Sequence, residues 1–351
     1  MTKLSAADQI RKKQRIKELL ADIVTNLKDY FDELQMKKFG GISRYVVLNR
    51  VDSIEMIGSK GLKLVKAEFN TDLGSLNLAI AIKNFQTYEE ALNNKILTER
   101  LVERLRHTGI LTPRVIFEYE KTLVYEGIQG KSFHDSSLDE MLKLTLAGDA
   151  IARFHTPELR PVDPERYVYL TKKVLKELKI STDSKNRLVE KGGALLERIL
   201  RYSSGTAAFG DFHPGNLLFS EEREQYVQPW LIDPEYAEAA RAADRFEDIG
   251  TFFVKAAIDH FLKDNNLQRF RENQIIPFIQ GYDHFLNHYG LSMYEIYKAN
   301  QEEALCFHLG LSTLLEALFI QRRVDLNNEI ALKRYTGCIK TSLHIWDSGL
   351  N

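Results

Sequence analysis

Cysteine is nearly absent from this sequence, and neither sign of charge is in excess. The two cysteines among 351 residues, Cys306 and Cys338, lie in stretches of helical character and lack the spacing of a metal site. They argue against a disulfide framework and for a reducing compartment. The 48 basic residues are matched by 49 acidic ones. Because nucleic-acid-binding proteins gather basic residues, this balance argues against nucleic acid as a partner.

The sequence also lacks the apolar runs that secretion and membrane insertion require. Its first residues, MTKLSAADQIRKKQRIKEL, contain no apolar core of a signal peptide. No stretch approaches the roughly 18 apolar residues that suggest a transmembrane helix. We therefore expect a cytoplasmic protein with no membrane partner, long enough to form two lobes with a sizeable core.

Hydrophobic periodicity divides the chain into an extension and two lobes. Residues 1–43 are predicted to form an N-terminal helical extension, because apolar residues recur there at three- and four-residue steps. Residues 44–127 contain β-like apolar runs separated by turns, with a helical stretch from Thr87 to His107. Residues 128–351 are mostly helical. The pattern predicts an α+β protein with a small lobe of about five antiparallel strands plus one helix, and a large helical lobe.

Residues 209–253 carry most of the chemistry. They begin FGDFHPGNLLF and end WLIDPEYAEAARAADRFEDIGTFF, with two apolar runs that flank a polar segment and predict a β-hairpin. Asp211 and Asn216 precede the first strand, and Asp233 ends the second. A hairpin would bring Asn216 and Asp233 together, and their oxygens suit Mg²⁺. Phosphoryl transfer needs such a metal and an acid that orients the attacking hydroxyl.

This stretch resembles the catalytic core of the aminoglycoside phosphotransferase and choline kinase superfamily, whose bilobal fold is related to that of protein kinases. The family pattern is HGD-x-H-x-x-N, then a hairpin and I-D-x-E, and IDPEYA is most similar to the choline and methylthioribose kinase form. The resemblance implies that Asp211 orients the acceptor hydroxyl or accepts its proton, and that Asn216 and Asp233 bind magnesium. Phe209 stands where the family has His, and its ring could support the loop by packing.

The resemblance also implies supporting residues around this core. His213 and Glu235 occupy motif positions, and Asp248 would brace the backbone of the catalytic loop. An acid at a helix start, as at Asp248, is also favoured by the helix dipole alone. His155, at the end of a predicted helix, is expected to be a buried, hydrogen-bonded support rather than a catalytic acid–base.

In the small lobe, Lys83 lies in AIAIKNF and resembles the kinase lysine that contacts the α- and β-phosphates of the nucleotide. A lysine between apolar neighbours is unusual, because lysine is almost never fully buried without a partner. Glu99 on the following helix is the predicted partner. Glu103, one turn later on the same face, is the alternative.

Two backbone segments complete the predicted nucleotide site. Gly58, Ser59 and Gly61 would approach the phosphates through their N–H groups, although an ordinary hairpin turn fits the same residues. The segment from Glu126 to Ile128 resembles the kinase hinge, whose main chain pairs with the adenine edge. The resemblance therefore implies ATP and Mg²⁺ as cofactors.

The predicted function is ATP-dependent phosphorylation of a hydroxyl on a small molecule, such as an amino alcohol, a sugar or an aminoglycoside. A protein kinase is disfavoured, because no A-P-E motif occurs and the segment from Asp233 to Asp248 is too short to dock a peptide. A catalytically weak, nucleotide-binding regulator of the same fold is the other alternative, which Phe209 favours. The acceptor, ATP against GTP as donor, and the oligomeric state stay open.

Overall fold

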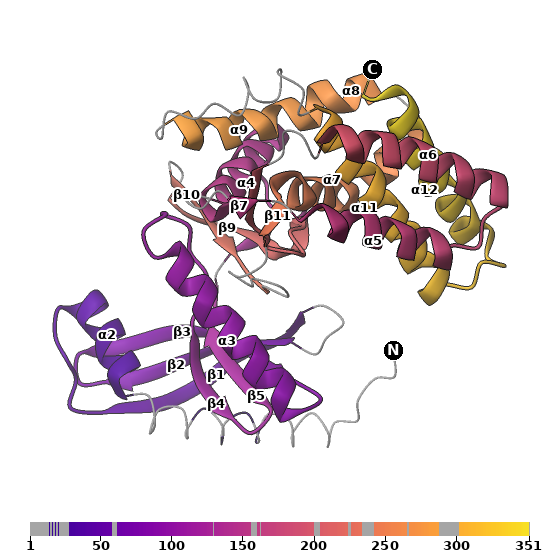
Figure 1. The fold of residues 1–351 in the computed structure, drawn as a ribbon. Coiled ribbons are helices and arrows are strands. Elements are labelled where there is room, and N and C mark those ends of the chain that lie inside the picture. Colours follow the sequence, from indigo (N-terminus) through magenta and orange to yellow (C-terminus); the bar gives the residue numbers. More distant parts are fainter. Residues whose placement is uncertain are drawn as a thin grey trace. The chain divides into compact units, whose positions relative to one another are not determined.

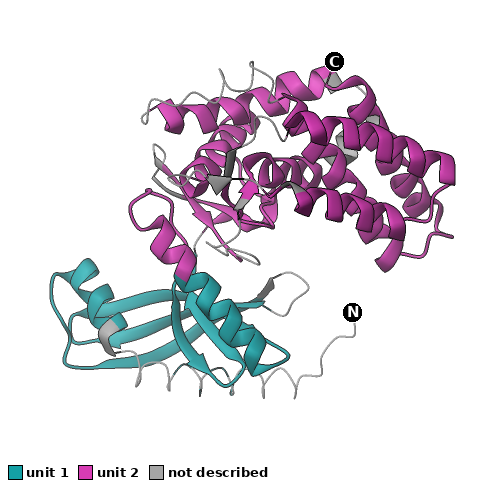
Figure 2. Cartoon of the chain, in the orientation of Figure 1, with its two compact units in different colours: residues 1–99, 113–129 teal, residues 100–112, 130–351 magenta. Residues whose placement is uncertain are grey.

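The computed structural model describes residues 28–57, 62–128, 130–155, 163–199, 204–223, 226–233, 242–264, 267–287 and 302–350, together with 14, 16, 18, 20, 160 and 161. The chain divides into two compact units, coloured separately in Figure 2. Unit 1 comprises Met1–Glu99 and Pro113–Gln129, and unit 2 comprises Arg100–Thr112 and Gly130–Asn351.

Unit 1 is built on a five-stranded antiparallel sheet with the strand order β1-β2-β3-β5-β4, labelled in Figure 1. Buried side chains alternate along it, as at Val65, Ala67 and Phe69, which is the period of a half-buried strand. The predicted antiparallel sheet is confirmed. Its strands are β1 (Val46–Ile57), β2 (Leu62–Thr71), β3 (Gly74–Asn84), β4 (Val115–Tyr119) and β5 (Thr122–Glu126).

Helix α3 (Tyr88–Leu105) interrupts the strands where the sequence predicts a helix. Its start is fixed by a reciprocal cap. The N–H of Glu90 donates to the hydroxyl of Thr87 at 3.1 Å, and the Glu90 carboxylate accepts the N–H of Thr87 at 3.4 Å as well as that of Gln86 at 2.9 Å. Both groups satisfy backbone donors that a helix start leaves unpaired. Ala91, in the first turn, is fully buried and packs with residues of β5.

The N-terminal helical residues share the core of the sheet. Helix α2 (Lys28–Phe39) brings Phe31 edge-on to Phe69 of β2, with ring centroids 5.1 Å apart. Ile16 and Leu20 are buried in the same cluster. The amphipathic pattern of this region therefore reflects packing on the sheet of unit 1.

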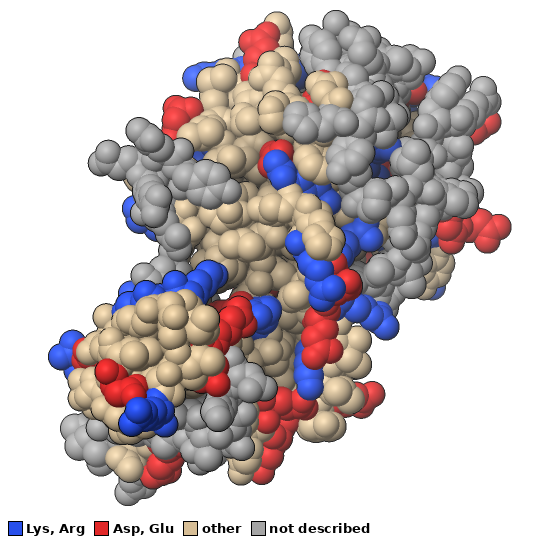
Figure 3. All heavy atoms as spheres, turned by 90° about the vertical axis from the view of Figure 1, so that its left-hand side faces the viewer, with Lys and Arg blue, Asp and Glu red and all other residues tan. Residues whose placement is uncertain are grey.

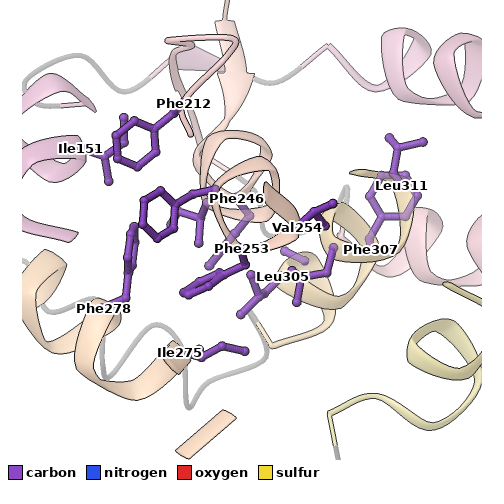
Figure 4. Close-up of a cluster of buried hydrophobic side chains, with 14 of the residues drawn as sticks. Ile151, Phe212, Phe246, Phe253, Val254, Ile275, Phe278, Leu305, Phe307 and Leu311 are labelled. Atoms are coloured by element: carbon purple, nitrogen blue, oxygen red, sulfur yellow. The ribbon is translucent and has the colours of Figure 1, made fainter. Parts of the chain in front are cut away.

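Unit 2 is mostly helical and surrounds one contiguous apolar core. Figure 4 shows part of it, with Phe212, Phe253 and Phe278 among the labelled side chains. The helices are α4 (Glu140–His155), α5 (Pro164–Glu177), α6 (Thr182–Ile199), α7 (Arg245–Asp264), α8 (Leu267–Phe270), α9 (Ile276–Asn287), α11 (Glu302–Arg323) and α12 (Glu329–Ser348), with a π-helical turn, η2 (Arg271–Ile275), between α8 and α9.

Helix α11 is apolar on nearly all sides. By length and composition it is the one helix among the described residues that could cross a membrane. However, 78% of its most apolar window is buried inside the protein. Helices α7 and α12 pack on it, with the ring of Phe307 stacked on Trp346 at 5.8 Å. It is therefore a core helix of unit 2.

The predicted hairpin is formed by β9 (Leu217–Arg223) and β10 (Tyr226–Leu231), with Leu217 opposite Leu231. The strands continue into the segment Ser220–Gln228 that the sequence assigns to the turn, because backbone pairing extends past the apolar residues. Four short strands have no sequence signal. They are β6 (Lys131–Ser132), which pairs with β9, and β7 (Arg160–Pro161), β8 (Ser204–Ala207) and β11 (Ala242–Asp244), which form a second small sheet.

Side chains of both signs of charge are visible on the face drawn in Figure 3. On the face drawn in Figure 3, basic and acidic side chains lie beside one another in each unit. This distribution agrees with the formal net charge of −1.

Candidate active site

The loop between β8 and the 3₁₀ turn η1 (Pro214–Asn216) is held by one buried carboxylate. Asp248, in the first turn of α7, accepts the backbone N–H of Phe209 through Oδ2 and that of Gly210 through Oδ1, each at 2.8 Å. Gly210 has φ of 90°, a conformation that glycine adopts at no steric cost. The two hydrogen bonds fix the main chain immediately before Asp211.

His155, the last residue of α4, forms a hydrogen bond with this carboxylate. Its Nε2 lies 3.0 Å from Oδ2 of Asp248, and its Nδ1 lies 2.8 Å from the hydroxyl of Tyr282 on α9. Burial lowers the pKa of His155, although the hydrogen bond to Asp248 opposes this shift. The ring is therefore neutral at pH 7 and acts as a hydrogen-bonded link between three helices. This is the buried supporting position that the sequence predicts.

Phe209 supports the loop by packing. The ring is fully buried, edge-on to Phe154 at 5.4 Å and to Phe212 at 6.0 Å. Phe212 in turn stacks on Phe252 of α7 at 5.1 Å. Figure 4 shows Phe212 reaching into this core. The side chain therefore anchors the loop in the core, while its backbone N–H still binds Asp248.

Asp211, His213 and Asn216 are brought together by the turn η1. The side-chain amide of Asn216 donates to the backbone carbonyl of Asp211 at 3.0 Å. Nδ1 of His213 accepts the N–H of Gly215 at 2.9 Å, so a neutral ring carries its proton on Nε2. That Nε2 lies 3.6 Å from Oδ2 of Asp211. The carboxylate of Asp211 is 31% exposed, so it is accessible to a substrate.

The hairpin places Asp233 beside Asn216. The backbone N–H of Ile232 donates to the carbonyl of Asn216 at 3.0 Å, which extends the β9–β10 ladder by one bond. Asp233 follows directly with φ of 54°. Left-handed backbone is uncommon for residues other than glycine, and such strain concentrates at functional sites.

The donor set around the hairpin fits Mg²⁺ bound together with a nucleotide. Because the amide nitrogen of Asn216 is bound to the Asp211 carbonyl, its side-chain oxygen is left as an acceptor. Asp233 adds a carboxylate. Mg²⁺ is usually held by one or two carboxylates together with substrate phosphates and water. Among the described residues there is no cluster of three or more His, Cys, Asp or Glu side chains that could hold a metal ion.

In unit 1, Lys83 lies on β3 opposite Leu123 of β5. It shares a sheet face with Ala81 and Phe85, because alternate residues of a strand point to one side. Those two residues pack against the cluster that contains Ala91 of α3. The Nζ of Lys83 lies 5.3 Å from the centroid of the Phe85 ring. The lysine is therefore partly buried on the side of the sheet that α3 covers.

The structure does not bring Lys83 and Glu99 together. Among the described residues no ion pair joins Lys83 to Glu99 or to Glu103, and both glutamates are exposed on α3. Glu103 pairs with Arg106 at 2.7 Å instead. The side chain of Thr98 is buried, and that of Glu99, the next residue, is exposed. The spacing of apolar residues alone does not fix which side of the helix faces the sheet.

The hinge-like segment begins where β5 ends. The N–H of Glu126 donates to the carbonyl of Arg114 at 3.0 Å, and the N–H of Gly127 donates to the carbonyl of Ala79 at 2.9 Å. A Cβ at Gly127 would lie 2.2 Å from the carbonyl carbon of Ala79, so only glycine fits. Ile128 is the next residue, and its N–H takes no part in these two bonds.

Four of the predicted positions cannot be placed. Gly58, Ser59, Gly61 and Glu235 lie outside the described residues. Two residues that contact predicted positions, one in each unit, were not themselves predicted. Tyr282 hydrogen-bonds His155 from 127 positions away in the sequence, and Arg114 binds the Glu126 carboxylate. Neither has a local sequence signal, because each contact forms only when distant elements pack.

No protein-family model and no curated protein matches the sequence. Solved structures do match. An ethanolamine kinase from Plasmodium vivax has a TM-score of 0.56 at 16% identity, over 85% of this chain and 83% of that one. A choline kinase from Cryptosporidium parvum Iowa II has a TM-score of 0.53 at 14% identity, over 92% and 97% of the two chains.

A further match is a complex of APH(2")-IIia with GDP and kanamycin. It has a TM-score of 0.52 at 12% identity, over 89% of this chain and 98% of that one. Identities this low show a shared architecture, and the predicted fold class is confirmed. The chain therefore shares its fold with the ethanolamine kinase, the choline kinase and the kanamycin-bound protein.

Proposed function

We propose that this protein is a phosphotransferase that moves the γ-phosphate of ATP to a hydroxyl group of a small molecule. One observation carries the proposal: the buried carboxylate of Asp248 binds two consecutive N–H groups and so fixes the loop that presents Asp211. Catalysis of phosphoryl transfer rests mainly on positioning and electrostatic stabilisation. A rigid loop with one accessible carboxylate supplies the first of these.

Asp211 has the proposed role of orienting the acceptor hydroxyl and accepting its proton. The carboxylate is partly exposed, and its neighbour His213, at 3.6 Å, presents a ring nitrogen toward it. A positioned general base typically contributes about 10²–10⁴-fold to a rate. His213 and Asn216 would keep the carboxylate and its backbone in place during the reaction.

Several residues have proposed roles toward the nucleotide. Asn216 and Asp233 are the proposed ligands of Mg²⁺, which would neutralise charge on the phosphates when bound. Lys83 would contact the α- and β-phosphates. The carbonyl of Glu126 and the N–H of Ile128 would pair with the adenine edge, because the N–H groups of Glu126 and Gly127 are already bound within the sheet.

The acceptor is proposed to be an amino alcohol, a sugar or an aminoglycoside. Ethanolamine kinase, choline kinase and a kanamycin-bound protein are among the solved structures that share the fold, and they support this range. They do not single out one member of it, because the likeness is one of architecture.

The test is ADP release with Mg-ATP across amino alcohols, sugars, nucleoside-derived thiosugars and aminoglycosides. We expect one class to stimulate release. Asp211→Asn should abolish that release and still bind Mg-ATP. Asp325→Asn makes the same chemical change in an exposed loop of unit 2, where the carboxylate accepts only the N–H of Asn327 among the bonds in the structure. It should leave the rate unchanged.

Two results would contradict the proposal. One is an Asp211→Asn variant as active as the parent. The other is a parent protein that neither releases ADP with any acceptor nor binds Mg-ATP.

A further inference from the structure

The residues at the two ends of the β4–β5 pair bind each other through side chains as well as main chain. Arg114 precedes β4, and Glu126 is the last residue of β5. The Glu126 carboxylate accepts three donors of Arg114: the backbone N–H at 3.1 Å, Nε at 3.0 Å and Nη2 at 2.7 Å. One arginine thus fixes the position of one carboxylate from two directions.

Helix α2 contributes a second carboxylate to the same guanidinium. Nη1 of Arg114 donates to Oε2 of Glu33, and Nη2 donates to Oε1, both at 3.2 Å. Two parallel hydrogen bonds of this kind form the bidentate geometry that arginine favours with carboxylates. Glu33 and Arg114 are 81 positions apart in the sequence, so the contact ties the N-terminal helix to the end of the sheet.

Tyr30, one turn before Glu33, borders the same cluster. Its ring lies 6.0 Å from the guanidinium carbon of Arg114. Burial raises the pKa of the Tyr30 hydroxyl well above its ordinary value, and the negative charge of Glu126 adds to the shift. Within the cluster, the side chain of Glu126 is the shielded one at 19% exposed, whereas those of Arg114 and Glu33 are 43% and 53% exposed. Charge pairing is stronger at a shielded group than at an open surface.

The cluster lies where the chain enters and leaves unit 1. The chain enters at Pro113, next to Arg114, and it leaves three residues after Glu126. The N–H of Arg114 binds the side chain of Glu126 and not its backbone carbonyl. The Glu126 carbonyl and the N–H of Ile128 are the main-chain groups that the proposed function assigns to the adenine edge.

We propose that Arg114 is a positioning residue for nucleotide binding, and that Glu33 makes helix α2 part of the support of the base-reading segment. The proposal rests on the proposed function. Main-chain hydrogen bonds to a base require donor–acceptor distances of about 2.7–3.2 Å. Loss of Arg114 would leave the Glu126 carboxylate, which is only 19% exposed, without its cation. The end of β5 would then move to solvate that charge, and the carbonyl of Glu126 would move with it.

The experiment measures the dissociation constants of Mg-ATP and Mg-GTP for the full chain and its variants. Arg114→Gln is expected to weaken binding of the preferred nucleotide about tenfold, equivalent to losing one charged hydrogen bond. It should also bring the two dissociation constants closer together, because base reading is impaired and phosphate binding is not. Arg114→Lys keeps the charge and should restore part of the preference.

Glu33→Gln provides a second variant that is expected to fold normally, since its carboxylate is 53% exposed. It should weaken the preferred nucleotide by about threefold, and its effect should vanish in the Arg114→Gln background, as expected for coupled residues. Arg50→Gln is the matched control. It removes an arginine paired with Glu68 at 3.1 Å on the same sheet and should change neither constant.

The possible failures are distinguishable. Unchanged nucleotide binding in Arg114→Gln would overturn the inference and leave the proposed function standing. An equal loss of ATP and GTP affinity would assign Arg114 a general structural role, which also overturns it, as would a parent protein without base preference. A parent protein that binds no nucleotide would overturn the proposed function and this inference together.

Discussion

The imidazole of His155 lies 3.0 Å from the carboxylate of Asp248, and both side chains are at most 5% exposed. Through this pair the end of α4 is linked to the backbone before Asp211. The pair joins residues 93 positions apart, and Tyr282 extends it to α9. The proposed catalytic carboxylate thus depends for its position on the packing of three helices.

Asp248→Asn should therefore lower both stability and turnover. An amide keeps one oxygen acceptor and presents its NH₂ group to a backbone donor, so one of the bonds to Phe209 or Gly210 is lost. We expect the free energy of unfolding to fall by about 1.5–3 kcal/mol, the range for a hydrogen bond to a charged group. Urea unfolding measures this. Asp163→Asn, at the start of α5, is the control, because Asn caps a helix as well as Asp does. Equal effects of the two changes would contradict the special role of Asp248.

The backbone conformation of Asp233 is predicted to lower stability, while its carboxylate is needed for turnover. Its φ of 54° strains any residue with a Cβ, and the cost is about 1–2 kcal/mol. Asp233→Gly should therefore unfold at a higher urea concentration than Asp233→Ala, by about 1 kcal/mol in free energy. Both variants lack the carboxylate, and neither should turn over ATP. An alanine variant as stable as the glycine variant would show that the backbone is not strained.

Gly127→Ala should displace the hinge-like segment. The added methyl would lie 2.2 Å from the carbonyl carbon of Ala79, so the main chain must move. We expect a loss of about 1–3 kcal/mol in stability, as for overpacked cores, together with weaker nucleotide binding. Gly193→Ala is the matched control, because nothing lies within 4 Å of its Cβ position in α6. That change should stabilise the protein by about 0.5–1 kcal/mol. Thermal unfolding and nucleotide titration measure both effects. A Gly127→Ala variant as stable and as tightly nucleotide-binding as the parent would contradict the prediction.

His308 on α11 should make stability depend on pH. Burial, and then the positive charge of Arg166, lowers the pKa of its ring from 6.5 to about 3. Between these values the unfolded chain binds a proton that the folded chain does not. Its contribution to stability is therefore full above pH 6.5 and falls as the pH drops toward 3, by up to about 1.4 kcal/mol per pH unit.

His308→Asn tests this by removing the titrating group. The slope of unfolding free energy against pH, measured between pH 6.5 and 5, should decrease by up to about 1.4 kcal/mol per pH unit, which corresponds to one proton. An unchanged slope would show that the ring is already accessible to protons in the folded protein.

Local patterns were sufficient for most elements of the fold. The alternation of apolar residues predicted the sheet of unit 1, and the capping pair Thr87 and Glu90 lies at the predicted start of α3. The hairpin that joins Asn216 to Asp233 also followed from its two apolar runs. The signals for these features, apolar alternation and caps, lie within short windows of the sequence, although the pairing of β3 with β5 joins distant residues.

Helix rotation was not accessible in the same way. Glu99 and Glu103 have the spacing of a lysine partner, yet they face solvent, because the buried side of α3 is set by Ala91 and Thr98 against the sheet. The short strands β6, β7, β8 and β11 also had no signal, since strands of two to four residues carry no periodicity.

The sequence by itself determined the β-rich and helical parts of the chain and the order of the motif residues from Phe209 to Asp248. Only the tertiary structure decided which rings Phe209 packs against, that Tyr282 and Asp248 are the partners of His155, and that Arg114 joins Glu33 to Glu126. The physical reason is range. Periodicity and caps act over a few residues, whereas buried charges and aromatic rings find partners only when segments up to 127 positions apart are packed together.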